Sequence, residues 1–431
     1  MPLPTINAAP PLAAPPARRP EAILPAVHPA LLRPWAAVAG ILPLPGGLDR
    51  TPVLNSNHPE IVRAPGIALS TLARVGPAHL DRAFEGPFEI FSHHVNGTGR
   101  DLHQAIVLHN DGERPVTVTL GPSAVRLGLY ALFFRLRGPL DAVLKAILRD
   151  RDAVMGPGPA VAEALLAGRR QRPEPALVVP PGQTVVLDAR RLAPWAVASS
   201  KWQLASDGPV RAAVLFDAGP LDAPRADAVL RRGHLAGRNP TDLAPTPPGD
   251  TGGRFIFGRV AGIQAGATWR GTLGSRPGEP GVVLGEAPQD LAWPIATKRG
   301  HLLGTGQDQT APIVSRLYDA AYAAHGNYGV TYDLALPLRN ATARPRRVEL
   351  WLDSPEPTPG MPLAFSGPVE VSWVDAAGRA HRVLSRLTTR PERGARVATL
   401  EVPAGHTLDA RVRLVYPADA TPPQVLRLRG A

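Results

Sequence analysis

Six of the twelve histidines crowd into one stretch of the chain, and histidine is the residue type here best suited to bind zinc or copper. Side chains alternate across a strand, so strand positions of the right parity could converge on one ion. Adjacent histidines point to opposite faces, however, and no H-x-H or HExxH spacing occurs. Polar or capping roles therefore compete with a divalent-metal site. The metal candidates are His93, His94, His103 and His109.

A second candidate site lies in GTGQDQTAP at 304–312 and HGNYGVTYDLALPLRN at 325–340. Glycines there permit positive φ angles and close approach of the backbone to a ligand. We therefore predict a ligand-facing cluster, with tight turns that merely feed a strand as the alternative. The segment lacks the third glycine and the helix that a dinucleotide site requires. The predicted cluster is Gln307, His325, Asn327 and Tyr328.

Motifs for catalysis are missing from the sequence. The chain has no cysteine, which excludes thiol catalysis and cysteine-ligated metals. No G-x-S-x-G segment occurs, and no serine can be paired with a histidine and a carboxylate from the sequence. A pair of catalytic carboxylates stays open, because such residues lie far apart in glycosidase sequences. We therefore predict no catalytic residue and no cofactor, with a divalent metal at the histidines as the alternative.

Composition favours short strands in more than one domain. A chain of 431 residues is too long for one ordinary core, and its 51 prolines and 42 glycines would break long helices. The net charge of +11 comes almost entirely from scattered arginines, with no basic stripe among aromatics, which argues against dedicated nucleic-acid binding. No apolar run reaches the roughly 18–20 residues of a membrane-spanning helix.

The chain divides into a leader and two predicted domains. Residues 1–45 are rich in proline and alanine and are expected to be disordered; their apolar stretch is too interrupted for a good signal peptide. Residues 46–245 form the first predicted domain, with a helical insertion at about 139–170 whose helices begin near Pro139 and Pro159. A linker at 222–250 leads to the second predicted domain, 251–431.

Strand patterns in the two halves echo each other. IVLHNDGERPVTVTL at 106–120 matches LPLRNATARPRRVELWL at 336–352, and VVPPGQTVVLDA at 178–189 matches EVPAGHTLDARVRL at 401–414. Asp111-Gly112 between two strand-like runs predicts a hairpin. We predict an all-β, mainly antiparallel fold of two β-sandwich-like domains with immunoglobulin-like layout, the first carrying the helical insertion.

Long motifs give the chain a family resemblance. They are LPGGLDRTPVLNSNHPEIV, FSHHV, GPGPAVAEALLAGRRQ, APTPP, FIFGRVAG, GTGQDQTAPIVSRLYDAAYAAHGNYGVTYDLALPLRN and YPADATPPQVL. With these motifs the chain resembles, over about residues 42–428, the bacterial domain-of-unknown-function family numbered 3370. The resemblance implies export, because many members carry an export signal, and it supplies no catalytic residue to carry over.

The function predicted from these features is non-enzymatic. We expect a cell-envelope or secreted protein that binds a surface polysaccharide or an envelope partner protein. The alternative is a metal-dependent or carboxylate-based hydrolase acting on envelope glycans, and a cytoplasmic assembly protein is a third interpretation. A convergent cluster of His, Asp and Glu in a cleft would favour the hydrolase.

Overall fold

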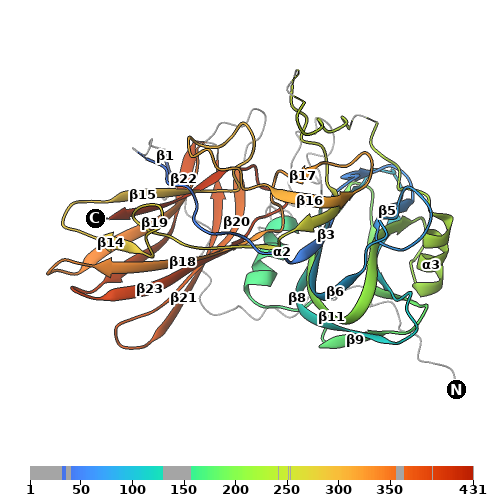
Figure 1. Cartoon of the computed structure of the whole chain (residues 1–431), viewed down its shortest axis with the longest axis horizontal. Helices are drawn as coiled ribbons and strands as arrows, with labels where there is room; N and C mark the ends of the chain where they lie inside the picture. The colour runs from blue at the N-terminus through green and yellow to red at the C-terminus, as the bar shows by residue number, and fades with distance from the viewer. Residues whose placement is uncertain are drawn as a thin grey trace, which may run out of the picture.

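The protein consists of β-sheet almost throughout, which confirms the predicted all-β, mainly antiparallel fold. Within the described residues the chain forms three sheets and two helices, and Figure 1 shows the strands gathered in two bodies. No helix among them is long and apolar enough to cross a membrane. The computed structural model describes residues 32–34, 40–129, 157–240, 242–250, 252, 254–355, 364–390 and 392–430.

The first body is built on one twelve-stranded sheet, in which most strands follow one another along a single path of paired neighbours. The order is β10 (Thr184–Leu192), β7 (Leu102–His109), β11 (Ala196–Asp217), β6 (Phe84–Asn96), β3 (Pro52–Ser56), β12 (Ala261–Ala265), β16 (Ala311–Arg316) and β17 (Ala323–Ala324). Off this path, β4 (Ile61–Val62) pairs with β6, β5 (Gly66–Ser70) with β11, and β8 (Val116–Leu129) with β11 and β9 (Ala176–Val179).

The second body is a sandwich of two sheets. The five-stranded sheet has the order β1 (Leu32–Pro34), β22 (Arg393–Val402), β19 (Arg346–Ser354), β24 (Gln424–Gly430) and β15 (Asp290–Ile295). The other sheet runs β2 (Gly47–Leu48), β13 (Thr268–Thr272), β18 (Thr331–Asn340), β23 (Thr407–Val415), β20 (Phe365–Val374) and β21 (Ala380–Thr389), with β14 (Val282–Leu284) beside β18.

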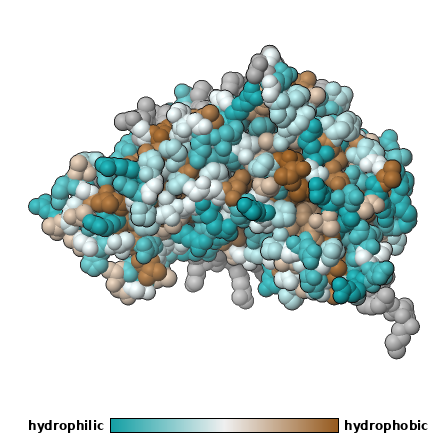
Figure 2. Space-filling model, viewed as in Figure 1, coloured by the Kyte–Doolittle hydropathy of each residue, from teal (hydrophilic) through white to brown (hydrophobic). Residues whose placement is uncertain are grey.

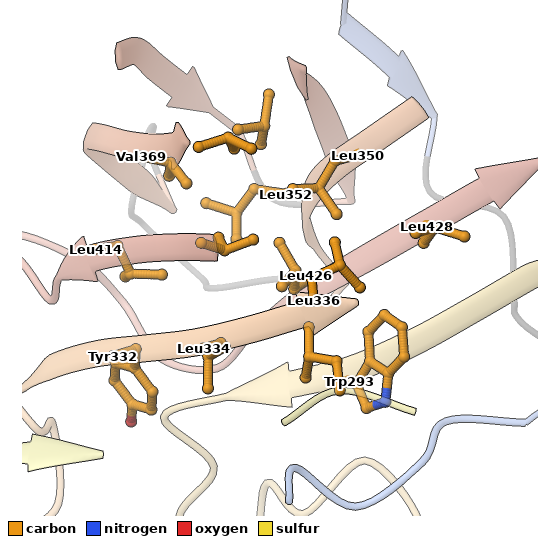
Figure 3. Packing of buried hydrophobic residues seen from close by; sticks show 14 of the residues in the cluster. Trp293, Tyr332, Leu334, Leu336, Leu350, Leu352, Val369, Leu414, Leu426 and Leu428 are labelled. Atoms are coloured by element: carbon orange, nitrogen blue, oxygen red, sulfur yellow. The ribbon is translucent and has the colours of Figure 1, made fainter. Parts of the chain in front are cut away.

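Alternating apolar residues build the core of the second body. Leu334 and Leu336 of β18 are fully buried and meet Leu350 and Leu352 of β19 from the opposite sheet (Figure 3). Because successive strand side chains point to opposite faces, this period of two puts one face of each sheet into the core. Trp293 of β15 adds the largest ring to the cluster shown there.

A single long strand organises the first body. The N-terminal part of β11 pairs with β6 and β8, whereas its C-terminal part pairs with β5 and β7. The register shifts between Ser206 and Val210, so Asp207-Gly208, a pair of residues common in turns, is an irregularity inside this one strand. The sheet thereby wraps around a core that contains Trp202 and Phe216, both fully buried.

Three asparagines in the described chain turn it from one layer of strands to another. Asn340 is the last residue of β18 in one sheet, and the chain after it enters β19 of the other. Its Nδ2 donates to the carbonyls of Arg344 at 2.8 Å and Val402 at 2.9 Å, while its Oδ1 accepts the N–H of Thr342 at 3.0 Å. The Asn340 amide thus provides hydrogen-bond partners for backbone groups of a sharp turn and, at the same time, for a backbone carbonyl at the end of a facing strand.

The same arrangement occurs at two earlier positions. Asn110 donates to Arg114 O at 2.7 Å and Val179 O at 2.9 Å. Asn96 donates to the carbonyls of Arg100 and Leu192. We call Asn96, Asn110 and Asn340 the asparagine corners. Asn110 and Asn340 occupy equivalent places in the echoed segments, so the sequence echo corresponds to a repeated structural device.

The hairpin predicted at Asp111-Gly112 is wrong, because an asparagine corner lies directly before these residues. The strands on either side of Asp111-Gly112 form as expected, but β7 and β8 do not pair with each other. Both pair with different parts of β11 instead, because the Asn110 corner redirects the chain after β7. By contrast, the turn at Ala377-Gly378 joins β20 and β21 in a true antiparallel hairpin.

The two helices differ in how well the sequence predicts them. Helix α2 (Pro157–Leu166) matches the helix expected from Pro159, whereas the helix expected from Pro139 lies outside the described residues. In α2, Val161 and Leu165 pack with Ala124 of β8 and Val415 of β23, so the helix fills the space between the bodies, as Figure 1 shows.

The predicted linker at 222–250 contains helix α3 (Ala223–Arg232), which corrects that prediction. Asp222 caps its first turn by accepting from the N–H of Arg225, and Gly233 ends it with a left-handed φ of 67°. These are the residue types expected at helix ends. The helix covers the outer side of the first body (Figure 1).

Strand pairing crosses the division predicted at 245–251. Strands β12 and β16 follow it in sequence but belong to the twelve-stranded sheet, and β2 precedes it but pairs with β13 of the second body. The pairs β2–β13 and β3–β12 together form a ribbon that links the bodies. Within the predicted leader, β1 pairs with β22, and Leu44 is buried.

A buried lysine fastens the two bodies together. Lys201 of β11 is 1% exposed, and its Nζ lies 2.5 Å from Oε2 of Glu89 on β6. The same ammonium donates to the carbonyl of Gly329, in the loop 325–330 that leads into β18. Gly329 has φ of 81°, and a Cβ there would lie 2.7 Å from the Phe91 ring. The loop is therefore held against the first body by the hydrogen bond from Lys201 and by the close packing of Gly329 on the Phe91 ring.

Replacing Asn340 by alanine should destabilise the second body by about 2–3 kcal/mol, because the buried Val402 carbonyl and the turn groups lose their partner. Urea unfolding followed by tryptophan fluorescence measures this. Asn340→Asp keeps the acceptor for Thr342 N–H but turns an oxygen toward the carbonyls of Arg344 and Val402, so it should be destabilised at least as much. A variant as stable as the wild type contradicts the role of the corner.

Lys201→Met should cost about 3–5 kcal/mol, because Glu89 is left as an unpaired buried charge. The double variant Lys201→Met with Glu89→Gln should recover much of that loss, since no buried charge remains. Thermal unfolding of the four proteins gives the coupling between the two residues. Additive effects in this cycle contradict a direct ion pair.

Candidate functional site

A cavity of about 180 Å³ lies between the first body and the loop 325–330. It is smaller than the roughly 300–1,000 Å³ of pockets for drug-sized molecules, so it suits one ring or one side chain. Its lining comes from strands β3 and β6, the segment before β12, the β15–β16 connection and the loop. The lining residues are Asn55, Asn57, Phe91, Phe257, Gly258, Arg259, Val260, Lys298, Ala324, His325, Gly326, Asn327 and Tyr328.

Two asparagine oxygens in the lining have no hydrogen-bond donor among the described residues. Asn55 is 3% exposed and Asn57 is 6% exposed, and the Oδ1 of each lacks a partner. Most buried polar atoms in proteins are hydrogen-bonded, so two neighbouring exceptions need an explanation. The Nδ1 of His325 in the same lining also lacks a partner. Three buried polar atoms without a partner among the described residues therefore belong to side chains that line this cavity.

The orientation of the Asn55 amide is fixed by a chain of hydrogen bonds. Gln264 donates through Nε2 to the carbonyl of Gly266 at 2.7 Å, which can only accept. Its Oε1 then accepts from Nδ2 of Asn55 at 2.8 Å. The Asn55 oxygen must consequently be the atom left without a donor, since exchanging the oxygen and nitrogen of Asn55 would place its oxygen against Gln264 Oε1.

Aromatic rings and cations form the other wall. The ring of His325 meets Phe257 at 4.8 Å and Phe255 at 5.7 Å between centroids, both edge-on. Lys298 Nζ lies 4.8 Å from the Phe257 ring centre, and the Arg299 guanidinium lies 4.2 Å from that of Phe255. Such contacts hold cations in place over ring faces. The aromatic rings thus make this wall apolar, and the cations over the rings make its edge positively charged.

Three of the four residues predicted to face a ligand lie in the cavity lining: His325, Asn327 and Tyr328. Burial lowers the pKa of His325 to about 4, against the raising effect of Asp308, so the imidazole is neutral at pH 7. Burial raises the pKa of Tyr328 to about 12, so the phenol is neutral as well.

Asn327 mainly holds the loop. With a φ of 49° it takes a left-handed conformation, accepts the N–H of Ala311 at 3.0 Å and donates to Gln309 O and to the Tyr332 hydroxyl. Gln307 lies outside the lining. Its amide makes two bonds with the backbone of Leu44, at 2.9 and 2.8 Å, so it anchors the segment before β2.

The four predicted metal-binding histidines are not brought together. His93 and His94 on β6 point to opposite sides: His93 Nε2 lies 4.0 Å from Asp419, and His94 Nε2 lies 2.9 Å from Ser56 Oγ. His103 and His109 lie on β7, where His109 contacts Thr184 Oγ1 at 3.0 Å. In the part of the chain that the structure describes, no three His, Asp or Glu side chains are grouped as metal ligands.

Ser56 and His94 form a hydrogen-bonded pair that the sequence does not reveal. Pro59 O lies 2.7 Å from the other ring nitrogen of His94, which orients the imidazole as in a nucleophile–base pair. Both residues are 0% exposed, however, and His94 has its pKa lowered to about 4 by burial. The pair therefore holds the cis His58-Pro59 segment in place and cannot reach a substrate.

A buried acidic group lies close to the cavity. Asp419 accepts the N–H of Gly158 at the start of α2 through Oδ2, at 2.9 Å, and its Oδ1 faces His93. Burial raises its pKa to about 7, and the charge of Glu60 adds to the rise. Glu60 pairs with Arg259 of the cavity lining, and burial raises its pKa too.

A larger cavity of about 240 Å³ lies elsewhere, between the segment at 42–45 and the loop at 274–280. Prolines dominate its lining, and none of its lining residues has a buried side-chain atom without a partner. Size alone would favour it. We take the smaller cavity as the candidate site because polar groups converge there.

Several lining residues escaped the sequence analysis. Asn55 and Asn57 are two residues apart at the end of a strand, a spacing that places both side chains on one face. This spacing of two residues was the signal in the sequence that could have identified Asn55 and Asn57. Phe257 and Lys298 gave no signal, because only the fold brings the segment before β12 next to the β15–β16 connection.

Comparison with known proteins gives one extensive match. A family model for proteins of unknown function, DUF3370, matches residues 40–430. No curated protein matches the chain.

Solved structures resemble the protein only distantly. The PBSX exported protein XepA has 8% identity and a TM-score of 0.15, with 81% of this chain and 84% of that one covered. A tandem of CBM22 domains from Paenibacillus barcinonensis Xyn10C has 10% identity and a TM-score of 0.15, with 85% and 98% covered. At these scores neither likeness bears on the fold or the function of this chain.

Asp419→Asn should change how stability depends on pH. The carboxyl has a pKa of about 7 in the folded protein and an ordinary value near 3.8 when unfolded, so the folded state holds its proton more tightly between these values. Wild-type stability should therefore fall as pH rises from 4 to 7, relative to the variant, by on the order of 2–4 kcal/mol.

Unfolding in urea at several pH values between 4 and 8 measures that difference. The amide oxygen introduced by Asp419→Asn can still accept from Gly158 N–H, so the cap is kept. Asp409→Asn on the exposed side of β23 is the matched control and should follow the wild type. Parallel curves for the wild type and Asp419→Asn would show that Asp419 is not held protonated.

Proposed function

This chain belongs to the DUF3370 family, and we propose that it is a non-enzymatic binding protein of the cell envelope or the extracellular space. Its binding site is the cavity beside the loop 325–330, which takes one unit of a surface polysaccharide. The envelope location is part of the proposal and follows from the resemblance, since many family members carry an export signal.

One observation carries the proposal: Asn55 and Asn57, whose buried Oδ1 atoms have no donor among the described residues, both line this small cavity. An unpaired buried acceptor costs about 1–3 kcal/mol, and a hydroxyl-bearing ligand removes that cost by donating to it. The ring of Phe257 offers an apolar face next to these acceptors. Acceptors beside an aromatic face suit a ring that has hydroxyls on its edge and C–H groups on its face.

A binding role fits the lining better than a hydrolytic one. Hydrolysis of a glycosidic bond commonly needs two carboxyl groups on either side of that bond. None of the lining residues is an aspartate or a glutamate. Asp419 has a raised pKa, as a general acid needs, but it serves as the cap of α2 and lies outside the lining.

A polymer also fits the surface better than a large protein partner does. On the face shown in Figure 2, hydrophobic residues form small separate patches among hydrophilic ones. Stable protein interfaces are commonly built around a larger continuous apolar core. The small cavity and the polar surroundings suit contact with single units of an extended polar chain.

The test is retention by polysaccharide extracted from bacterial envelopes and cast into a native gel, with the full chain as probe. The wild type should be retarded, and Asn57→Ala should lose at least about ten-fold in affinity because the acceptor is removed. Thr272→Ala beside the larger cavity is the control and should behave as the wild type.

Two results would contradict the proposal. A wild-type protein that migrates equally with and without polysaccharide has no such binding activity. Release of new reducing ends by the wild type, lost in Asp419→Asn, would show the hydrolase instead. Cell fractionation tests the location separately, since recovery only from the cytosol contradicts an envelope role.

A further inference from the structure

We propose that a group of arginines beside helix α2 binds the phosphate group of a ligand. The group consists of Arg126 on β8 with Arg169 and Arg170 after α2, and we call it the arginine cluster. None of the three lines the cavity beside the loop 325–330, so the inference goes beyond the proposed function and does not depend on it. The observation behind it is the half-buried guanidinium of Arg126, which is held in one orientation by neutral groups only.

Hydrogen bonds hold the segment after α2 against β8. The N–H of Ser123 donates to the carbonyl of Arg169 at 2.8 Å, and the N–H of Gln171 donates to Ser123 Oγ at 3.0 Å. Gln171 Oε1 in turn accepts the N–H of Val125 at 3.1 Å. Arg169 thereby lies close enough to Arg126 for its charge to lower the pKa of that guanidinium.

The same glutamine orients Arg126. Nη1 of Arg126 donates to Gln171 Oε1 at 3.3 Å and to the carbonyl of Val125 at 2.8 Å. In the described part of the chain neither Nε nor Nη2 has an acceptor, and neither is a buried atom. Nε and Nη2 form the side-on edge of a guanidinium, which can bind two oxygens of one anion. Arg126 therefore presents an oriented, accessible fork to solvent.

Positive charge gathers around this fork. Burial lowers the pKa of Arg126, and the charges of Arg169 and Arg190 lower it further. Arg190 has its own partner, since its Nη2 lies 2.7 Å from Oδ1 of Asp188. Among the described residues no carboxylate forms an ion pair with any member of the arginine cluster. An anion placed between these guanidinium groups would relieve their mutual repulsion.

The acidic side chains nearby already have partners. The charge of Glu163 on α2 raises the pKa of Arg126, against the larger lowering effects, but its Oε1 accepts from Arg386 at 2.6 Å. Glu174 lies 3.2 Å from Nε of Arg172. These carboxylates reduce the local charge without occupying the fork of Arg126.

The end of α2 does not account for the arginine cluster either. Cationic side chains often follow a helix because they satisfy its last carbonyls. Here the carbonyl of Leu166 accepts from Nη2 of Arg382 at 2.9 Å. The three carbonyls before it accept backbone N–H groups: Glu163 from Ala167, Ala164 from Arg169 and Leu165 from Gly168. The exposed side chains of Arg169 and Arg170 are therefore not needed as caps.

A phosphate group matches the arginine cluster better than a single carboxylate does. A phosphate monoester carries a charge of about −1.5 to −2 at pH 7 and three acceptor oxygens. Two of these oxygens can take the fork of Arg126, and the third remains for Arg169. A carboxylate has one charge and two oxygens, so the fork alone would use it completely.

The experiment titrates the full-length protein with glycerol 3-phosphate in phosphate-free buffer, followed by calorimetry, with acetate and sulfate for comparison. The phosphate ester should bind saturably and about ten-fold or more tightly than acetate. Its second pKa is about 6, so binding should weaken as the pH falls from 8 to 5. Sulfate is a dianion throughout this range, and its binding should stay constant.

Variants connect the binding to the arginine cluster. Arg126→Met should weaken binding of glycerol 3-phosphate about ten-fold, and Arg126→Lys should lie between it and the wild type because it keeps the charge but not the fork. Arg169→Met, at an exposed position, should weaken it too. Arg82→Met removes an exposed arginine that follows β5 and should have no effect. Thermal unfolding checks that each variant is folded.

Two further probes identify the source of the phosphate. Displacement of sulfate by glycerol 3-phosphate, without co-sedimentation on phosphatidic acid vesicles, supports a soluble phosphate ester. Co-sedimentation on phosphatidic acid vesicles, but not on phosphatidylcholine vesicles, supports a lipid headgroup, provided that Arg126→Met abolishes it.

Three results overturn the inference. The first is the absence of saturable binding to the phosphate ester and to phosphatidic acid vesicles alike. The second is acetate binding as tight as that of the ester, and the third is a loss in Arg82→Met as large as that in Arg126→Met. Retention by polysaccharide is tested through Asn57, so this inference can fail while the proposed function stands.

Discussion

The fold depends on one charge placed where water does not reach. Lys201 lies on strand β11. Its ammonium is held by Glu89 of strand β6 and by the carbonyl of Gly329 in the loop that leads into the second body. A buried ion without its partner costs several kcal/mol, so these three elements are stable only together. The loop forms one wall of the candidate site. The position of that wall is therefore set by an ion pair deep in the first body.

The asparagine corners solve a second problem, that of moving a strand-rich chain between layers without losing backbone hydrogen bonds. At each corner one amide satisfies the turn and the edge of another strand, so the chain can pass to another layer of strands within a few residues. Asn96 and Asn340 even share the pattern Asn-x-Thr-x-Arg. In both, the threonine hydroxyl binds the asparagine oxygen and the arginine carbonyl. Local sequence thus encodes the change of layer.

That local encoding explains what the sequence could predict. The echoed segments correctly marked equivalent positions in the two halves, and Val348, Leu350 and Leu352 of one of them are buried in the core. Strand pairing was harder, because Asp111-Gly112 has the composition of a hairpin turn and only the distant Val179 carbonyl shows that Asn110 redirects the chain. Helix α3 was missed although Asp222 and Gly233 are ordinary cap residues, because proline and alanine around it resembled a linker.

The candidate site shows the same division between local and distant information. The sequence pointed to His325 and Tyr328 because glycines surround them, and both line the cavity. It also suggested Gln307, whose amide is instead used by the backbone of Leu44, more than two hundred residues away. A residue's type can show that it is able to bind. Whether its groups are already used depends on contacts that no local pattern records.

The ribbon between the bodies finally explains why the Asn55 amide keeps its orientation. Gly266 makes the turn between β12 and β13, with a φ of 99°, and its carbonyl orients Gln264, which in turn orients Asn55. The same ribbon holds the bodies together through β2–β13 and β3–β12. A side chain fixed by the element that joins the bodies cannot turn to find another donor. The architecture thus keeps the Asn55 oxygen without a donor among the described residues.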